Sequence, residues 1–372
     1  MSSTKRHQNR LKEWFPHTSK PFIANAPMLG FANHQLATAV TKAGGLGFIG
    51  GGFDFSPSST QLVKLDSELT KARTELKIAD SGTLPIGVGF ITFKPSGFEE
   101  NVVPLLDKHR VSAVWLSFPN EDADHTSIIA AIRDARVKSE WPVKVFVQVG
   151  TVQGAATAAE QGADVIVVQG TDAGGHQWAR GASLISLLPD VSESLGDVYD
   201  VALLAAGGIV GGKGVLLRWV WAQMGLLWGR GWVFGDRLGR NIANIVQFVA
   251  TEECPAPALI KDSIVKAQDG ASSTVKSVRH DVFQSTDVFP RQYDGRALVG
   301  ISWTEAQSGV SDEEVIRRYD EAIKQGEDHR RTWCKCRVDF FGAVCERADG
   351  TGSTGGQVDC CEHHGSYMIG VP

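Results

Sequence analysis

One histidine stands in a sequence context that suits proton transfer. His176 follows an apolar run that ends at Gln169, and it comes directly after Gly174 and Gly175 in the stretch V-V-Q-G-T-D-A-G-G-H-Q-W. Imidazole takes up and releases protons near neutral pH. A lone histidine is more often a hydrogen-bonded structural residue, but its place after a predicted strand, beside two glycines, favours a functional role. The sequence therefore indicates His176 as a candidate general base.

A second glycine-rich stretch has the features of an anion site. In Leu203–Gly214, L-L-A-A-G-G-I-V-G-G-K-G, an apolar segment leads through Gly207 and Gly208 into a further glycine-rich turn. Backbone N–H groups exposed at such a turn, with a helix N-terminus nearby, can bind a phosphate. The pattern is neither G-x-G-x-x-G nor a P-loop, so it favours a phosphate-tailed cofactor over a dinucleotide or a nucleoside triphosphate.

A third candidate is the stretch A-P-M-L-G, Ala26–Gly30. Pro27 fixes its own φ, and the polarizable thioether of Met28 can lie against a flat ring. By itself, this motif is more often an ordinary core methionine.

These stretches follow apolar runs that are typical of parallel strands buried on both faces. The seven runs are Pro21–Met28, Gly45–Gly50, Leu84–Ile91, Val111–Phe118, Lys144–Gly150, Ala163–Gly170 and Val201–Gly208. The amphipathic segments between them include Asn33–Ala43, Ser58–Ala79, Asp124–Val137 and Val152–Gln161. This alternation predicts an α/β fold, and an eighth unit would close a TIM-type (β/α)8 barrel. An open doubly wound sheet is the alternative, and in both folds ligands bind at the strand carboxyl ends.

The composition excludes several functional classes. Of 372 residues, 42% are hydrophobic and 21% charged, which fits a folded protein, and the net charge of −5 provides no basic field for nucleic acid or acidic membranes. No apolar run is long enough to span a bilayer. Cys254 is the one cysteine before residue 334, which suggests a reducing compartment. We therefore expect a cytoplasmic protein with small-molecule partners and an unknown oligomeric state.

The set of motifs resembles the nitronate monooxygenase family, formerly called 2-nitropropane dioxygenase. The resemblance covers roughly residues 20–215. Its motifs are A-P-M-x-G, K-A-G-G-L-G-F-I-G-G-G (Lys42–Gly52), V-F-V-Q-V-G-T (Val145–Thr151), Q-G-T-D-A-G-G-H (Gln169–His176) and A-A-G-G-I (Ala205–Ile209).

The resemblance implies an FMN-dependent βα-barrel oxidoreductase. Such enzymes oxidise alkyl nitronates, and in some cases nitroalkanes, with dioxygen to a carbonyl compound and nitrite. The implied site residues are Ala26, Pro27 and Met28 against the flavin, Gln148 and Gln169 at its ring or ribityl chain, Gly174 lining the same site, Gly207 and Gly208 at the phosphate, and His176 as the catalytic base. Gly89 occupies a strand-end position where many members carry asparagine, so the family pattern supports its cofactor contact less strongly.

The resemblance breaks after Val215. Leu216–Gln247 contains four of the ten tryptophans and lacks the expected Gly-Thr-Arg phosphate clasp. We hypothesise a reading-frame error, because codons permitted for Leu216–Gly231, read one base out of frame, can spell A-A-L-G-L-G-A-D-G-V-V-M-G-T-R, the missing family segment. Trp232–Gln247 would then be translated intron. Taken as written, the chain predicts an atypical eighth unit, with a substitute strand around Gly231–Gly235 and weakened FMN binding.

The expected segments are residues 1–20 as a polar N-terminal segment, 21–250 as the FMN-binding barrel, 251–332 as a helical and loop segment packed on the barrel, and 333–372 as an irregular, Cys-rich tail that we expect to be disordered. The tail has Cys334, Cys336, Cys345, Cys360, Cys361, His363 and His364. Zinc binding there is an alternative that the spacing does not favour, so no metal site is expected. Ser311–His329 has the pattern of a surface helix with a solvated, mixed-charge face.

Two other functions fit parts of the sequence. Another FMN barrel enzyme, such as a flavin-dependent enoyl reductase, would need NADH or NADPH. A catalytically impaired barrel that binds a phosphorylated ligand without turnover is the non-enzymatic alternative.

Overall fold

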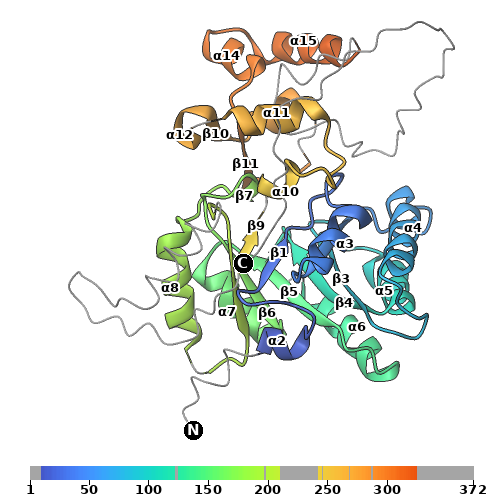
Figure 1. Ribbon diagram of the computed structural model, residues 1–372. Helices are drawn as coiled ribbons and strands as arrows, with labels where there is room; N and C mark the ends of the chain where they lie inside the picture. The colour runs from blue at the N-terminus through green and yellow to red at the C-terminus, as the bar shows by residue number, and fades with distance from the viewer. Residues whose placement is uncertain are drawn as a thin grey trace, which may run out of the picture. The chain divides into compact units, whose positions relative to one another are not determined.

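The computed structural model describes residues 10–121, 125–196, 198–209, 242–244, 246–267, 269–285 and 288–324. Within these ranges, eight strands form one parallel sheet in the order β1-β9-β8-β6-β5-β4-β3-β2 (Figure 1). They are β1 Ile23–Asn25, β2 Gly47–Gly52, β3 Leu84–Ile91, β4 Val111–Ser117, β5 Lys144–Val149, β6 Val165–Gln169, β8 Ala202–Ala206 and β9 Ile242–Asn244. A second sheet is antiparallel, with the order β10-β11-β7. Its strands are β7 Gly175–Trp178, β10 Thr274–Ser277 and β11 Tyr293–Leu298.

The helices alternate with the strands of the parallel sheet up to β8. In the first part of the chain they are α2 Arg10–Trp14, α3 His34–Lys42, α4 Thr60–Glu75, the π-helix η1 Phe98–Val102, α5 Val103–His109, α6 His125–Lys138, α7 Val152–Gln161 and α8 Leu184–Leu195. Further along are α10 Val246–Val249, α11 Ala258–Lys266, α12 Gly270–Ser273, α13 Arg279–Phe283, α14 Ile301–Gln307 and α15 Asp312–Lys324. Side-chain oxygens of Asn33, Ser59 and Thr151 accept from backbone N–H groups and so begin α3, α4 and α7.

All seven predicted strands of the parallel sheet are present, as are the four predicted helices that begin near residues 33, 58, 124 and 152. The α/β class with a parallel sheet is therefore confirmed. The strand between β8 and β1 is Ile242–Asn244, whereas the expected substitute strand at Gly231–Gly235 lies outside the described residues. The stretch after Gln169 that leads through His176 contains a further strand, β7, which no apolar run indicated. It forms because β11 pairs with it more than a hundred residues further along the chain.

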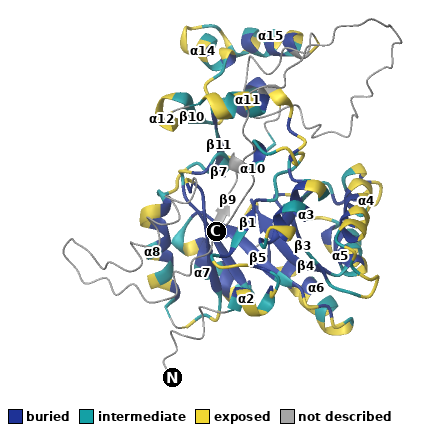
Figure 2. Ribbon diagram, in the orientation of Figure 1, coloured by how far each residue is buried: buried dark blue, intermediate teal, exposed yellow. Residues whose placement is uncertain are grey.

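The two faces of the parallel sheet pack differently. One face, with Val88, Leu116 and Val147, joins the helices in the largest apolar cluster. The alternate residues form a second cluster that includes Phe48 and Trp115. Because neighbouring residues of a strand point to opposite faces, continuous apolar runs supply both clusters. Figure 2 shows strands such as β4 and β5 buried along most of their length, and helices such as α4 and α8 with one exposed side.

The sheet is strongly curved. The ring centroids of Phe48 on β2 and Phe146 on β5 lie 5.4 Å apart. In the strand order, β2 and β5 are separated by three strand spacings of about 4.8 Å each, so a flat sheet would hold these residues much further apart. Ala24 of β1 also forms a parallel bridge with Leu46, the residue before β2. The two ends of the strand order are therefore adjacent.

Helix α15 differs from the predicted solvated helix on one face. Val315 and Tyr319 are buried, and Val315 belongs to a cluster with Phe283 and Ala306. The charged residues Glu314 and Arg317 form ion pairs on the exposed face. The helix thus anchors α13 and α14.

Contacts separate the chain into residues 1–338 and 339–372. The second unit lies outside the described residues, and so do the tail cysteines and histidines. No helix in the described part of the chain is long and apolar enough to cross a membrane.

Candidate functional site

The expected site residues lie at the carboxyl ends of different parallel strands. Ala26–Met28 follow β1, Gln148 is the penultimate residue of β5, Gln169 ends β6, and Gly207 follows β8. Carboxyl ends of parallel strands meet at one edge of the sheet. The fold therefore brings these residues to a common edge, although only some of them contact one another.

Gln148 and Gln169 form a directed chain of hydrogen bonds. The indole nitrogen of Trp115 donates to Oε1 of Gln148 at 3.1 Å, and Nε2 of Gln148 donates to Oε1 of Gln169 at 3.0 Å. Nε2 of Gln169 then donates to the backbone oxygen of His176 at 3.1 Å. An indole N–H can only donate, so Trp115 fixes which atom of each amide is oxygen. Trp115 was not among the expected site residues.

Both glutamines are buried, and each has a second amide hydrogen. Gln148 is 8% exposed and Gln169 is 5% exposed. Within the described ranges, neither side-chain nitrogen has a second acceptor. The spare N–H groups are donors that a buried ligand can use.

Gly89 lies against Pro27 of the A-P-M-L-G stretch. A Cβ atom at Gly89 would be 2.1 Å from Cγ of Pro27, so only glycine permits this close approach. Met28 packs on a cluster that contains Leu36, Val249 and Ile260. The A-P-M stretch is thus held from β3 and from the helices after β9.

The backbone after β8 turns through two left-handed residues. Gly207 has φ +97° and Gly208 has φ +67°, a region that other residues adopt at a cost. A Cβ atom at Gly207 would lie 2.8 Å from Cβ of Ala173, the residue before Gly174. The glycine pair and the Gly170–Gly175 loop are therefore in direct contact.

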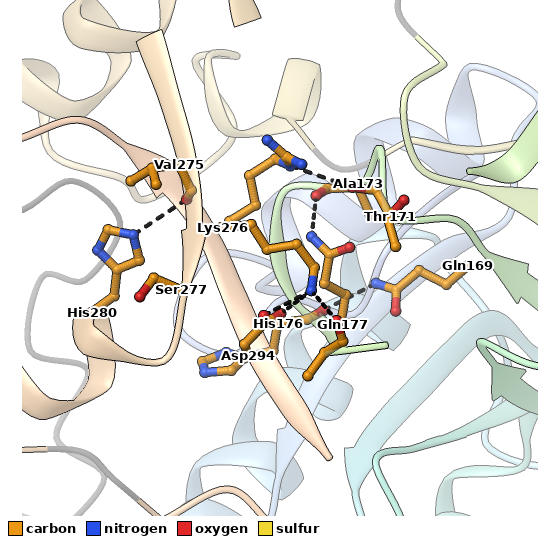
Figure 3. Close-up of polar contacts among 12 residues, drawn as sticks. Gln169, Thr171, Ala173, His176, Gln177, Val275, Lys276, Ser277, His280 and Asp294 are labelled. Carbon is orange, nitrogen blue, oxygen red and sulfur yellow. Dashed lines mark hydrogen bonds and ion pairs between the residues drawn. The ribbon is translucent and has the colours of Figure 1, made fainter. Parts of the chain in front are cut away.

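The loop that leads to His176 is held by hydrogen bonds from several elements (Figure 3). Nε2 of Gln177 donates to the carbonyl oxygen of Ala173 at 2.8 Å, and Nε of Arg296 donates to that of Thr171 at 3.3 Å. Lys276 donates to the carbonyl oxygen of Ala179 at 2.8 Å. Arg296 and Lys276 come from the second sheet, so the late part of the chain fixes the conformation of this loop.

The imidazole of His176 contacts groups that follow it by more than a hundred residues. Its Nε2 lies 3.0 and 2.9 Å from the two carboxylate oxygens of Asp281. Its ring stacks on Phe289, with centroids 3.8 Å apart and planes at 13°. The sequence analysis missed both partners, because R-H-D in α13 and a single phenylalanine form no motif.

Burial lowers the pKa of another histidine, His125, to about 4. Its Nε2 lies 2.7 Å from the hydroxyl oxygen of Thr92. This histidine is neutral near pH 7 and structural. Among the described residues, no group of three or more His, Cys, Asp or Glu side chains is arranged to hold a metal ion.

The sequence model of one family, described as nitronate monooxygenase, matches residues 11–217. A nitronate monooxygenase of Neurospora crassa is 38% identical over 338 residues, which cover 87% of this chain and 85% of that protein. A nitronate monooxygenase of Metarhizium robertsii is 33% identical over 321 residues, covering 85% and 83%.

Two solved structures have a similar fold. FabK from Thermotoga maritima superposes with a TM-score of 0.60 at 21% identity, covering 87% of this chain and 86% of that one. A nitroalkane oxidase from Streptomyces ansochromogenes gives 0.59 at 22% identity, covering 86% and 89%. At these identities the likeness supports the fold alone.

Proposed function

The chain belongs to the nitronate monooxygenase family and is thus an oxidoreductase, and we propose that it oxidises alkyl nitronates and nitroalkanes with dioxygen, using FMN. The products are a carbonyl compound and nitrite. The observation that carries this proposal is the position of His176, whose backbone is held by the amide chain and whose ring is held by Asp281 and Phe289.

FMN fits the residues at the common edge of the sheet. A flavin ring presents nitrogen and oxygen acceptors along its edge, and Gln148 and Gln169 each have a buried N–H to donate. The turn at Gly207 and Gly208 suits the phosphate, while the Gly-Thr-Arg half of the clasp is absent from the sequence as written. When bound, FMN accepts electrons from the substrate and passes them to dioxygen.

We further infer that the parallel sheet closes into a (β/α)8 barrel. The bridge between Ala24 and Leu46 joins the two ends of the strand order. Phe48 and Phe146 meet as they would inside a barrel, where side chains from several strands fill the interior. Closure directs all strand carboxyl ends to one mouth, which is the site proposed here.

The task of the protein's own groups is to remove and hold one proton. A neutral nitroalkane must lose its α-proton to become a nitronate, and His176 is the base that accepts it. Phe118 and Phe289 surround the imidazole with apolar rings and so limit its access to water. A nitronate added as substrate has already lost this proton and does not need the base.

One spectroscopic experiment tests the proposal. The purified full chain should show the absorbance of an oxidised flavin, which should bleach when ethylnitronate is added without oxygen. Readmitting oxygen should restore the absorbance and release nitrite. If NADH bleaches the flavin absorbance and ethylnitronate does not, the protein is instead a flavin-dependent reductase. A colourless protein that does not bind added FMN would contradict the cofactor assignment.

Small nitro compounds and dioxygen are the proposed partners, without nucleic acid or membrane. We also propose that the chain divides into residues 1–20, 21–250, 251–332 and 333–372, and that the protein is cytoplasmic.

A further inference from the structure

The carboxylate of Asp281 approaches one nitrogen of His176 with both of its oxygens. The distances to Nε2 are 3.0 and 2.9 Å, and the two side chains are 15% and 8% exposed. An ionised carboxylate only accepts hydrogen bonds, so Nε2 must carry the hydrogen. In the neutral ring the lone pair is therefore on Nδ1.

The surrounding structure fixes this geometry. Phe289 stacks on the imidazole at 3.8 Å and 13°, which sets the plane of the ring. Phe118 meets it edge-on, with centroids 6.4 Å apart. The ring therefore has little freedom to rotate about its Cβ–Cγ bond. The contact with Asp281 determines that Nε2 points toward the carboxylate and Nδ1 points away from it.

Helix α13 holds Asp281 in place from its other side. Phe283, two residues later and about 200° around the helix, is buried with Ala306 and Val315 of α14 and α15. Arg279 forms an ion pair with Asp312 at 2.6 Å, which ties α13 to the start of α15. His280 stacks on Trp303 of α14, with centroids 5.6 Å apart. The segment beyond the family match therefore positions the carboxylate.

We propose that Asp281 is a positioning residue, which selects the Nε2–H tautomer of His176 and stabilises the imidazolium formed during proton abstraction. This inference rests on the proposed function, with His176 as the base. In the step, the α C–H bond of the nitroalkane breaks, its electron pair stays on the nitronate, and the proton moves to Nδ1 of His176. The positive charge that appears on the ring lies beside the buried negative charge of Asp281.

The sharpest kinetic test compares two substrates that differ by this proton. In Asp281→Asn, kcat/KM for nitroethane should fall at least about tenfold, while kcat/KM for preformed ethylnitronate should stay within about threefold of the wild type. Asp294→Asn is the matched control, because Asp294 is a buried carboxylate of the same region whose partner is Lys276 rather than His176. In this control, the ratio of kcat/KM for nitroethane to kcat/KM for ethylnitronate should be that of the wild type.

A second measurement needs no turnover. The measurement is ¹⁵N NMR of the full chain with labelled histidine. The resonances of His176 are identified as those that are absent from the spectrum of His176→Gln. They should show a protonated Nε2 and an unprotonated Nδ1 in the neutral wild-type ring, and Asp281→Asn should lose this strict preference, because an amide can donate as well as accept.

The outcomes separate the two claims. A wild type that oxidises neither substrate contradicts the proposed function, and the NMR result still decides the role of Asp281. An Nδ1–H tautomer in the wild type, an unchanged nitroethane rate in Asp281→Asn, or an equal loss with both substrates would each overturn the positioning role.

Discussion

The indole of Trp115 and the side-chain amide of Gln148 are joined by a hydrogen bond of 3.1 Å that can run in one direction only. Because the indole donates, Gln148 must present its oxygen to Trp115 and its nitrogen to Gln169. Gln169 therefore presents its oxygen to Gln148, and its nitrogen donates to the backbone oxygen of His176. A fully buried tryptophan thus sets the orientation of two amides at the proposed flavin site.

Replacing Trp115 by phenylalanine should disturb the site more than the fold. The change leaves Oε1 of Gln148 without its donor, at a cost of about 1 to 3 kcal/mol, and lets the amide turn over. Flavin affinity should fall about tenfold, measured by titration of the apoprotein with FMN. Trp141→Phe is the control, since Trp141 is equally buried but donates to the backbone of Val111. Equal losses of FMN affinity in both variants would contradict the directed chain.

Removing the proposed base should affect neutral substrates selectively. In His176→Gln, kcat/KM for nitroethane should fall about 10²- to 10⁴-fold, the usual contribution of a general base. The rate with ethylnitronate should fall much less, because no proton has to be removed. Steady-state oxygen consumption with both substrates measures the difference, and an unchanged nitroethane rate would assign the base elsewhere.

A methyl group at Gly207 should weaken FMN binding and the fold together. Gly207→Ala combines a left-handed φ of +97° with a Cβ 2.8 Å from Cβ of Ala173. Gly309→Ala is the matched control, because Gly309 has φ +92° and nothing within 4 Å of an added Cβ. The control should lose about 1 to 2 kcal/mol of stability from conformation alone and keep its flavin affinity. Denaturant unfolding and FMN titration compare the two variants. Equal losses of stability and of flavin affinity in Gly207→Ala and Gly309→Ala would contradict crowding at the proposed phosphate-binding turn.

The buried His125 should make stability depend on pH. Its pKa is about 4 in the folded protein, against an ordinary 6.5, because burial disfavours the charged ring. The unfolded chain therefore binds the proton first, and stability that is present above pH 6.5 is lost as the pH falls toward 4. The loss is about 3 kcal/mol, at about 1.4 kcal/mol per pH unit. Urea unfolding of the wild type and of His125→Gln at several pH values should show this extra slope in the wild type only.

Correcting the suspected reading frame should strengthen flavin binding. The variant replaces Leu216–Gly231 by A-A-L-G-L-G-A-D-G-V-V-M-G-T-R and omits Trp232–Gln247. It restores the Gly-Thr-Arg part of the proposed phosphate clasp, so it should purify with more FMN per chain, as measured by absorbance. Its V-V-M would take the place between β8 and β1 that Ile242–Asn244 holds. A transcript that encodes Leu216–Gln247 in frame, or flavin at full occupancy in the chain as written, would refute the hypothesis.

The amino-acid sequence by itself determined the strands and the candidate residues at their ends. Seven apolar runs predicted seven strands of the parallel sheet. A strand that is buried on both faces needs apolar side chains at consecutive positions, so each strand is visible within its own short stretch of sequence. The motifs around Gln169 and Gly207 could be recognised for the same reason, since each lies within about ten consecutive residues. Their roles toward a flavin stay predictions.

Only the tertiary structure decided what surrounds the proposed base. Strand β7 exists because β11 pairs with it, and the tautomer of His176 depends on Asp281, 105 residues away. The orientation of Gln148 depends on Trp115, a tryptophan that looks like ordinary core in the sequence. The physical reason is that a proton's position depends on which acceptor lies within 3 Å in space, and the order of residues along the chain does not specify that distance.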